Sequence, residues 1–80
     1  MSQDQDAQLV RMVNQIAANL SHGREATSAV AAIRTHLEKF WARPMKRRVV
    51  AQLAQEDSDL TPLARRAVAQ LAQRLTETPT

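Results

Sequence analysis

Apolar residues recur at steps of three and four along most of the chain. They do so in four segments, at about residues 6–20, 24–41, 44–55 and 62–75. This spacing places the apolar side chains on one stripe of an α-helix, and the alternation typical of strands is missing. The sequence therefore predicts an all-α protein, a compact bundle of about four short amphipathic helices.

Residues that favour helix ends lie between these segments. Asp4 or Asp6 can cap the first helix, and Gly23 suits the left-handed conformation that follows a helix. Pro44 disfavours helix in the residue before it and can stand at the start of the next one. Thr61-Pro62 combines a capping residue with a proline at the first helical position, so the fourth helix is expected to begin there.

The length of the chain is that of one small domain. We expect residues 1–75 to form a single helical domain with a short acidic N-terminal end at 1–5, and 76–80 to be a frayed tail. The chain has 80 residues and no cysteine, so neither disulfides nor thiolate metal sites can stabilise it. A partner surface is the expected source of additional stability. The polar N-terminus and the lack of an apolar run of ~18 residues predict a cytoplasmic protein without a membrane span.

Positive charge is concentrated in the middle of the chain. Residues 34–48 contain six basic residues against one acidic residue, a local charge of +5, whereas 1–33 and 49–80 each sum to −1. Such a run is usually a solvated helix face, but it can also bind an acidic protein or nucleic acid. At spacings of three and four, Lys39, Arg43, Lys46 and Arg47 are expected to share one face.

The residues that carry catalysis or bind metals are scarce. Catalysis by a nucleophile requires a base that a third group holds in contact with it. Ser21 and His22 are neighbours in a predicted loop, and the side chains of such neighbours rarely point at each other. His36 and Glu38 match part of a zinc-binding pattern, but the cysteine ligands of that pattern are missing. A single glycine cannot form a phosphate-binding loop. We therefore expect no catalytic residue, no metal site and no cofactor in this chain.

Phe40 and Trp41 are the only aromatic residues besides the histidines. Adjacent helical residues lie ~100° apart, so both cannot face the same core centre. We expect Phe40 to fill the core and Trp41 to lie either at a helix junction of the core or in a pocket of a partner. Trp beside Arg is common at the energetic centre of protein interfaces.

Three short motifs resemble the delta subunit of cytosolic NAD-dependent formate dehydrogenase. They stand in the order and spacing of that family, between residues 9 and 71, as Leu9-Val10-Arg11-Met12-Val13-Asn14-Gln15-Ile16, His36-Leu37-Glu38-Lys39-Phe40-Trp41 and Leu60-Thr61-Pro62-Leu63. One departure follows the tryptophan, where the family usually has an acidic residue and then Pro-Arg-Met. This chain has Ala42-Arg43-Pro44-Met45 at that point.

The resemblance implies a non-catalytic accessory subunit of a molybdenum- or tungsten-dependent complex. In such complexes the larger subunits carry the molybdopterin, the iron–sulfur clusters and the flavin, and the delta subunit supports assembly or stability. The expected partner is the large molybdenum-containing subunit. An alternative from the basic segment is a small helical nucleic-acid-binding or regulatory module, for example a helix-turn-helix made of the third and fourth helices. The acidic connector between them argues against this alternative.

The candidate partner-binding residues combine the aromatic pair, the basic segment and two polar positions. They are Asn14, His36, Lys39, Phe40, Trp41, Arg43, Lys46 and Arg47. For Asn14, in the middle of the first helix, the expected role is either to cap a neighbouring helix or to bond the backbone of a partner.

Overall fold

The computed structural model describes residues 2–55 and 57–77. Within them the chain forms α1 (Ser2–Leu20), α2 (Ala26–Phe40), α3 (Arg43–Ala51) and α4 (Pro62–Glu77), and a short 3-10 helix, η1 (Gln52–Ala54), follows α3. These residues contain no strand. The prediction of an all-α bundle of about four short helices is confirmed.

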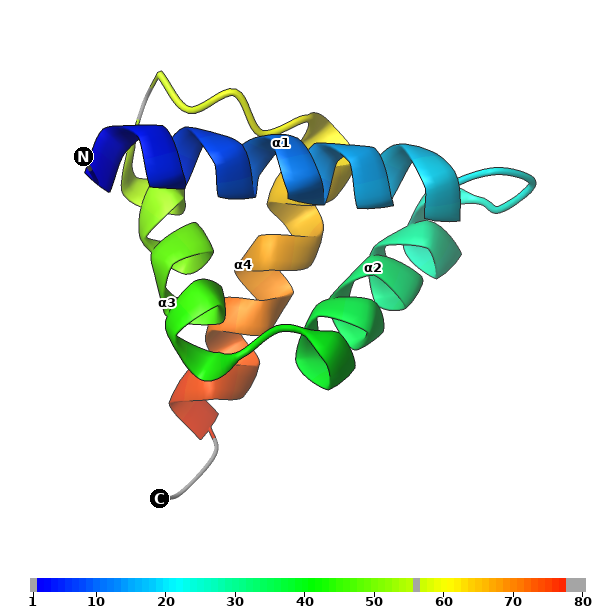
Figure 1. The fold of residues 1–80 in the computed structure, drawn as a ribbon. Coiled ribbons are helices and arrows are strands. Elements are labelled where there is room, and N and C mark those ends of the chain that lie inside the picture. The colour runs from blue at the N-terminus through cyan, green and yellow to red at the C-terminus, as the bar shows by residue number, and fades with distance from the viewer. Residues whose placement is uncertain (1, 56, 78–80) are drawn as a thin grey trace.

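Helix α1 lies across the other three helices (Figure 1). α2 and α3 extend away from its two ends, and α4 runs between them. The most extensive interface joins α2 to α4, and α1 contacts all three of the others. This arrangement leaves the side of α2 that faces away from α4 at the edge of the molecule (Figure 1).

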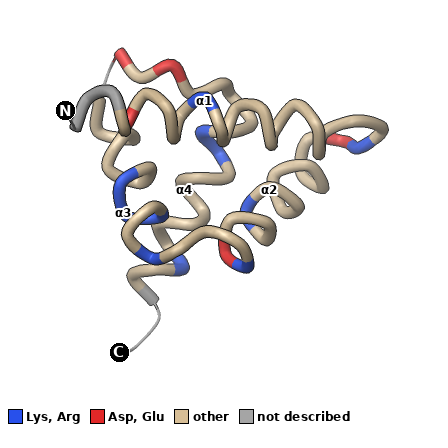
Figure 2. The backbone as a smooth tube through the Cα atoms, viewed as in Figure 1, with Lys and Arg blue, Asp and Glu red and all other residues tan. Residues whose placement is uncertain are grey.

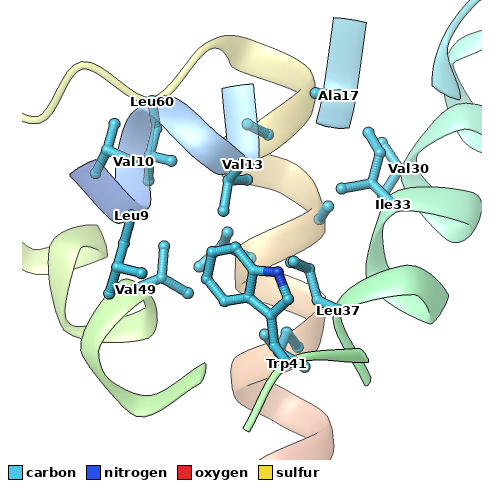
Figure 3. Packing of buried hydrophobic residues seen from close by; sticks show 14 residues of the cluster. Leu9, Val10, Val13, Ala17, Val30, Ile33, Leu37, Trp41, Val49 and Leu60 are labelled. Carbon is cyan, nitrogen blue, oxygen red and sulfur yellow. The ribbon is translucent and has the colours of Figure 1, made fainter. Parts of the chain in front are cut away.

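One hydrophobic cluster fills the space between the helices (Figure 3). Each of the four helices contributes to it, in agreement with the apolar stripes of the sequence. The side chains with the largest fully buried volume are Ile33, Leu37, Leu71, Val13, Val30, Val49 and Val68. On α1 Val13 is buried and its neighbour Met12 is exposed, and on α2 Ala29 is buried whereas Ala26 is exposed.

The ends of the helices differ from the prediction at several points. α1 begins at Ser2, so Asp6 lies inside the helix and does not cap it. Its Oδ1 instead accepts a hydrogen bond from Arg48 Nε at 3.2 Å, which ties α1 to α3. The side chain of Asp4, the other predicted cap, lies outside the described residues. At the other end α4 includes Thr76, whose hydroxyl donates to the carbonyl of Ala72 at 2.8 Å, so the helix extends into the predicted tail; residues 78–80 lie outside the described part.

The two turns around α2 follow from glycine and proline. Gly23 has φ of +69°, the left-handed conformation predicted for it, which side chains with a Cβ rarely adopt. After α2 the backbone is extended at Trp41 and Ala42, and Pro44 stands in the first turn of α3. Because proline cannot continue a preceding helix without a break, α2 and α3 are two helices that meet at an angle.

Candidate protein-docking surface

The junction between α2 and α3 places two adjacent aromatic side chains in opposite environments. Trp41 follows the last helical residue with φ −94° and ψ 136°, and its N–H donates to the carbonyl of Leu37 at 3.1 Å. This extended turn directs the indole into the core, near Leu37 and Val49 (Figure 3), where it is 7% exposed. Phe40, the last residue of α2, is 72% exposed. The expectation that Phe40 fills the core is wrong, and of the two positions considered for Trp41 the structure shows the core junction.

Phe40 does not stand alone on the surface. Its ring lies 4.9 Å from the His36 ring, centroid to centroid, with an angle of 44° between the planes. One helical turn separates the two residues, so the contact is a local one along α2. His36 is half-buried, and it supports Phe40 from one side while the rest of the phenyl ring faces solvent.

The basic residues near the junction do not share one helix face, contrary to the prediction. Lys39 belongs to the end of α2, whereas Arg43, Lys46 and Arg47 belong to α3. Figure 2 shows lysine and arginine positions along α3 and at the neighbouring end of α2. Arg43 and Arg47 are one turn apart on α3, and both are exposed, as is Lys39.

Part of the basic segment is used within the fold. Lys46 Nζ lies 3.4 Å from the carbonyl oxygen of Glu38 near the end of α2, where a cation is favoured by the helix dipole. The Glu38 carboxylate in turn lies 3.1 Å from Arg34 Nε and 3.4 Å from Arg74 Nε. These contacts join α2 to α3 and to α4. By contrast, Lys39, Arg43 and Arg47 form no ion pair within the part of the chain that the structure describes. We call Phe40, His36 and these three cations the junction surface.

Asn14 binds the connector that precedes α4. Its Nδ2 donates to the carbonyl of Asp59 at 2.9 Å, and its Oδ1 accepts a hydrogen bond from the N–H of Thr61 at 3.0 Å. Both ends of the amide are therefore engaged in holding residues 59–61 against α1. Of the two roles expected for Asn14, the structure shows the one within the chain, at the residues just before α4.

A shallow groove of about 420 Å³ on the outer face of α2 was missed by the sequence analysis. Its floor consists of small side chains, and Arg24 lies at one end while Lys39 and Phe40 lie at the other. The floor residues are Ser28, Ala31, Ala32 and Thr35. Their helical spacing opposite the apolar stripe was visible in the sequence, but small residues carry no sign of whether a neighbouring helix covers them.

The remaining candidate chemistry is dispersed. Ser21 Oγ donates to the carbonyl of Ala18 at 3.1 Å, and His22 is exposed. Among the described residues, no group of three or more His, Asp or Glu side chains is arranged to hold a metal ion. In the same residues no helix combines the length and apolar character needed to cross a bilayer.

The basic segment also lacks the geometry of a helix-turn-helix. Residues 52–61 separate α3 from α4, whereas the turn of that motif usually has about three or four residues. Asp57 and Asp59 are exposed in this connector, where they would face phosphates. The structure therefore gives no support to the helix-turn-helix model.

Comparisons with known proteins identify a family for this chain. Searches of curated proteins and of solved structures returned no significant similarity to the chain. Residues 8–68 match the model of the family described as NADH-dependant formate dehydrogenase delta subunit FdsD. This range includes Asn14 and the residues 59–61 that it binds, the whole of α2 and α3, and the start of α4. The match also covers His36, Phe40 and Trp41, the residues that form the α2–α3 junction. Because it spans about three quarters of the sequence, the chain belongs to the FdsD family of formate dehydrogenase delta subunits.

Proposed function

We propose that this chain is a non-catalytic accessory subunit of a soluble, cytoplasmic NAD-dependent formate dehydrogenase. It binds the large molybdenum-containing subunit and supports assembly, cofactor loading or stability of the complex. Membership of the delta-subunit family supports the assignment to this enzyme. The chain itself is assigned no cofactor and no catalytic residue, since the redox groups of such enzymes belong to the larger subunits.

The observation that carries the docking proposal is the exposure of Phe40. A phenyl ring that is 72% exposed retains most of the free energy available from its burial, which is about 1.5–3 kcal/mol for a complete Phe side chain. Lys39, its neighbour in the sequence and in the lining of the same groove, has no ion-pair partner among the described residues, and aromatic and arginine side chains are enriched at interface centres. The junction surface is therefore the proposed docking site.

Two of the candidate partner-binding residues have a different role in this proposal. Trp41 supports the junction surface from inside the core, and Asn14 holds the connector in place. Lys46 also has a role within the fold, because its ammonium group lies near the Glu38 carbonyl. We propose that direct contacts with the partner come from His36, Lys39, Phe40, Arg43 and Arg47.

The proposed mechanism is linkage between binding and stability. A subunit that binds the assembled, cofactor-loaded enzyme more tightly than the incomplete one stabilises the loaded form, and the stabilisation grows with the logarithm of one plus the ratio of free subunit concentration to Kd. No covalent chemistry by the delta chain is required. The mechanism predicts that the effect of the subunit depends on its concentration.

Deletion of the gene tests this function. We expect formate-dependent NAD reduction in extracts to fall while the large subunits are still made, and the purified complex to contain less molybdenum or to dissociate more readily. Addition of the purified chain to that complex separates two versions of the proposal. Restored activity indicates a structural role on the mature enzyme, and unrestored activity indicates a role during cofactor loading. Full activity, normal metal content and equal durability without the chain would refute the proposal.

A further inference from the structure

The groove on α2 offers a surface on which another helix can pack. Its floor residues Ser28, Ala31, Ala32 and Thr35 follow one another at steps of three, one and three, so they form a continuous stripe along the helix. All four are half-buried, and their short side chains allow the backbone of a neighbouring helix to approach closely. From Ser28 to Lys39 the helix rises roughly 16 Å, at about 1.5 Å per residue, which corresponds to about three turns of a partner helix.

The positive charges of the groove favour a ligand with negative charge. Arg24 lies at one end, where its Nη1 is 3.4 Å from Ser28 Oγ, and Lys39 lies at the other end. Among the described residues, none that lines the groove carries a carboxylate. The acid next to Lys39, Glu38, lies between Arg34 and Arg74, and the acid next to Arg24, Glu25, is exposed and does not line the groove. Carboxylates about three turns apart on one side of a partner helix would therefore meet a cation at both ends.

The end of the groove also supplies an apolar anchor. Phe40 lines the groove together with His36, and its ring is largely exposed beside the imidazole. A helix lying on the small-residue floor would end against this ring. The three features together, a floor of small side chains, a cation at each end and an exposed ring at one end, match the recognition of an amphipathic helix in a groove.

We infer that the groove on the outer face of α2 binds an acidic amphipathic helix of the partner protein. The apolar residues of that helix pack on Ala31, Ala32 and Phe40, and its carboxylates pair with Arg24 and Lys39. The inference rests on the proposed function for the identity of the partner, formate dehydrogenase. It adds the chemistry of the segment that the delta chain recognises.

The experiment measures binding of the full chain to formate dehydrogenase purified without it. Ala32→Glu places a bulky carboxylate on the groove floor, and Ala69→Glu makes the same change at an exposed position of α4. We expect Ala32→Glu to weaken binding at least tenfold and Ala69→Glu to change it less than twofold. The double variant Arg24→Glu/Lys39→Glu alters only exposed side chains, so it tests the charge even if Ala32→Glu is unstable. We expect it also to weaken binding at least tenfold.

A photo-crosslinking amino acid at position 32 identifies the occupant, with the same amino acid at position 69 as the control. We expect crosslinks from position 32 alone, to a helical segment with carboxylates on the side that faces the groove. Crosslinks to a segment without carboxylates, to a second copy of this chain or to nucleic acid would overturn the inference. The inference would also be overturned if the groove variants bound the enzyme as tightly as the unmodified chain does. In that case the proposed function would still stand. If the unmodified chain does not bind the enzyme at all, both fail together.

Discussion

Phe40 and Trp41 are neighbours in the sequence, yet the first is 72% exposed and the second 7%. The α-helix ends between them, and the extended conformation at Trp41 rotates its side chain away from the direction that a continuing helix would give it. One residue thus closes the core and the other remains available on the surface. The stability of the fold and the docking proposal can therefore be tested separately at adjacent positions.

Trp41→Ala should destabilise the isolated chain by about 3–5 kcal/mol, because it removes a large buried side chain and leaves a cavity in a small core. A loss of this size is comparable with the whole stability of many small domains. Phe40→Ala should change the free energy of unfolding by less than about 0.5 kcal/mol, as is usual for surface substitutions. Thermal and denaturant melts of the two variants measure the difference. Equal melts would contradict the assignment of Trp41 to the core.

Asn14→Ala should lower the stability of the chain by about 1–2 kcal/mol, since two hydrogen bonds to the backbone of 59–61 are lost and each usually contributes about 0.5–1.5 kcal/mol. Asn19→Ala is the matched control, because it makes the same substitution at an exposed position of the same helix. The difference between the two variants in the free energy of unfolding measures the contribution of the two Asn14 hydrogen bonds. If both melt alike, the two bonds contribute nothing to stability.

Glu38→Gln should reduce stability by about 0.5–1 kcal/mol, the range of partly exposed ion pairs. The Glu38 side chain is 28% exposed and its carboxylate lies between Arg34 and Arg74, so solvent screens part of the attraction. We expect the loss to shrink as salt is raised from 0.05 to about 0.5 M, where the Debye length becomes short. Glu25→Gln, at an exposed position, serves as the control and should have little effect. A loss that does not change with salt would argue for packing rather than charge.

Duplex DNA should bind only weakly, with an affinity that falls steeply as salt is raised, because neutralising phosphates releases counterions. The local charge of +5 gives such non-specific attraction, but Lys46 and Arg48 are partly engaged within the fold. Fluorescence anisotropy with labelled duplexes at several salt concentrations measures the slope. Nanomolar, sequence-selective binding at physiological salt would favour a nucleic-acid function over the one proposed.

The sequence was sufficient to predict the four helices, the turn at Gly23 and the start of α4, because periodicity, glycine and proline act locally. It did not determine which of two adjacent aromatic residues is buried. That choice depends on the angle between α2 and α3, which is set by the packing of both helices on α4. The role of Asn14 and the pairing of Asp6 with Arg48 join residues more than forty positions apart, and no local pattern specifies such contacts. The groove was missed for the same reason, since its openness depends on what the other helices leave uncovered.

The affinity of the Phe40→Ala variant for formate dehydrogenase prepared without this subunit tests the account most directly. The measurement compares it with the unmodified chain and with Met12→Ala, a change at the other large apolar side chain found exposed among the described residues. Loss of the phenyl contact should weaken binding about tenfold or more, which corresponds to ~1.4 kcal/mol, while the melt of the free chain is unchanged and Met12→Ala binds normally. Undiminished affinity of Phe40→Ala, or no binding by the unmodified chain, would contradict docking through the junction surface.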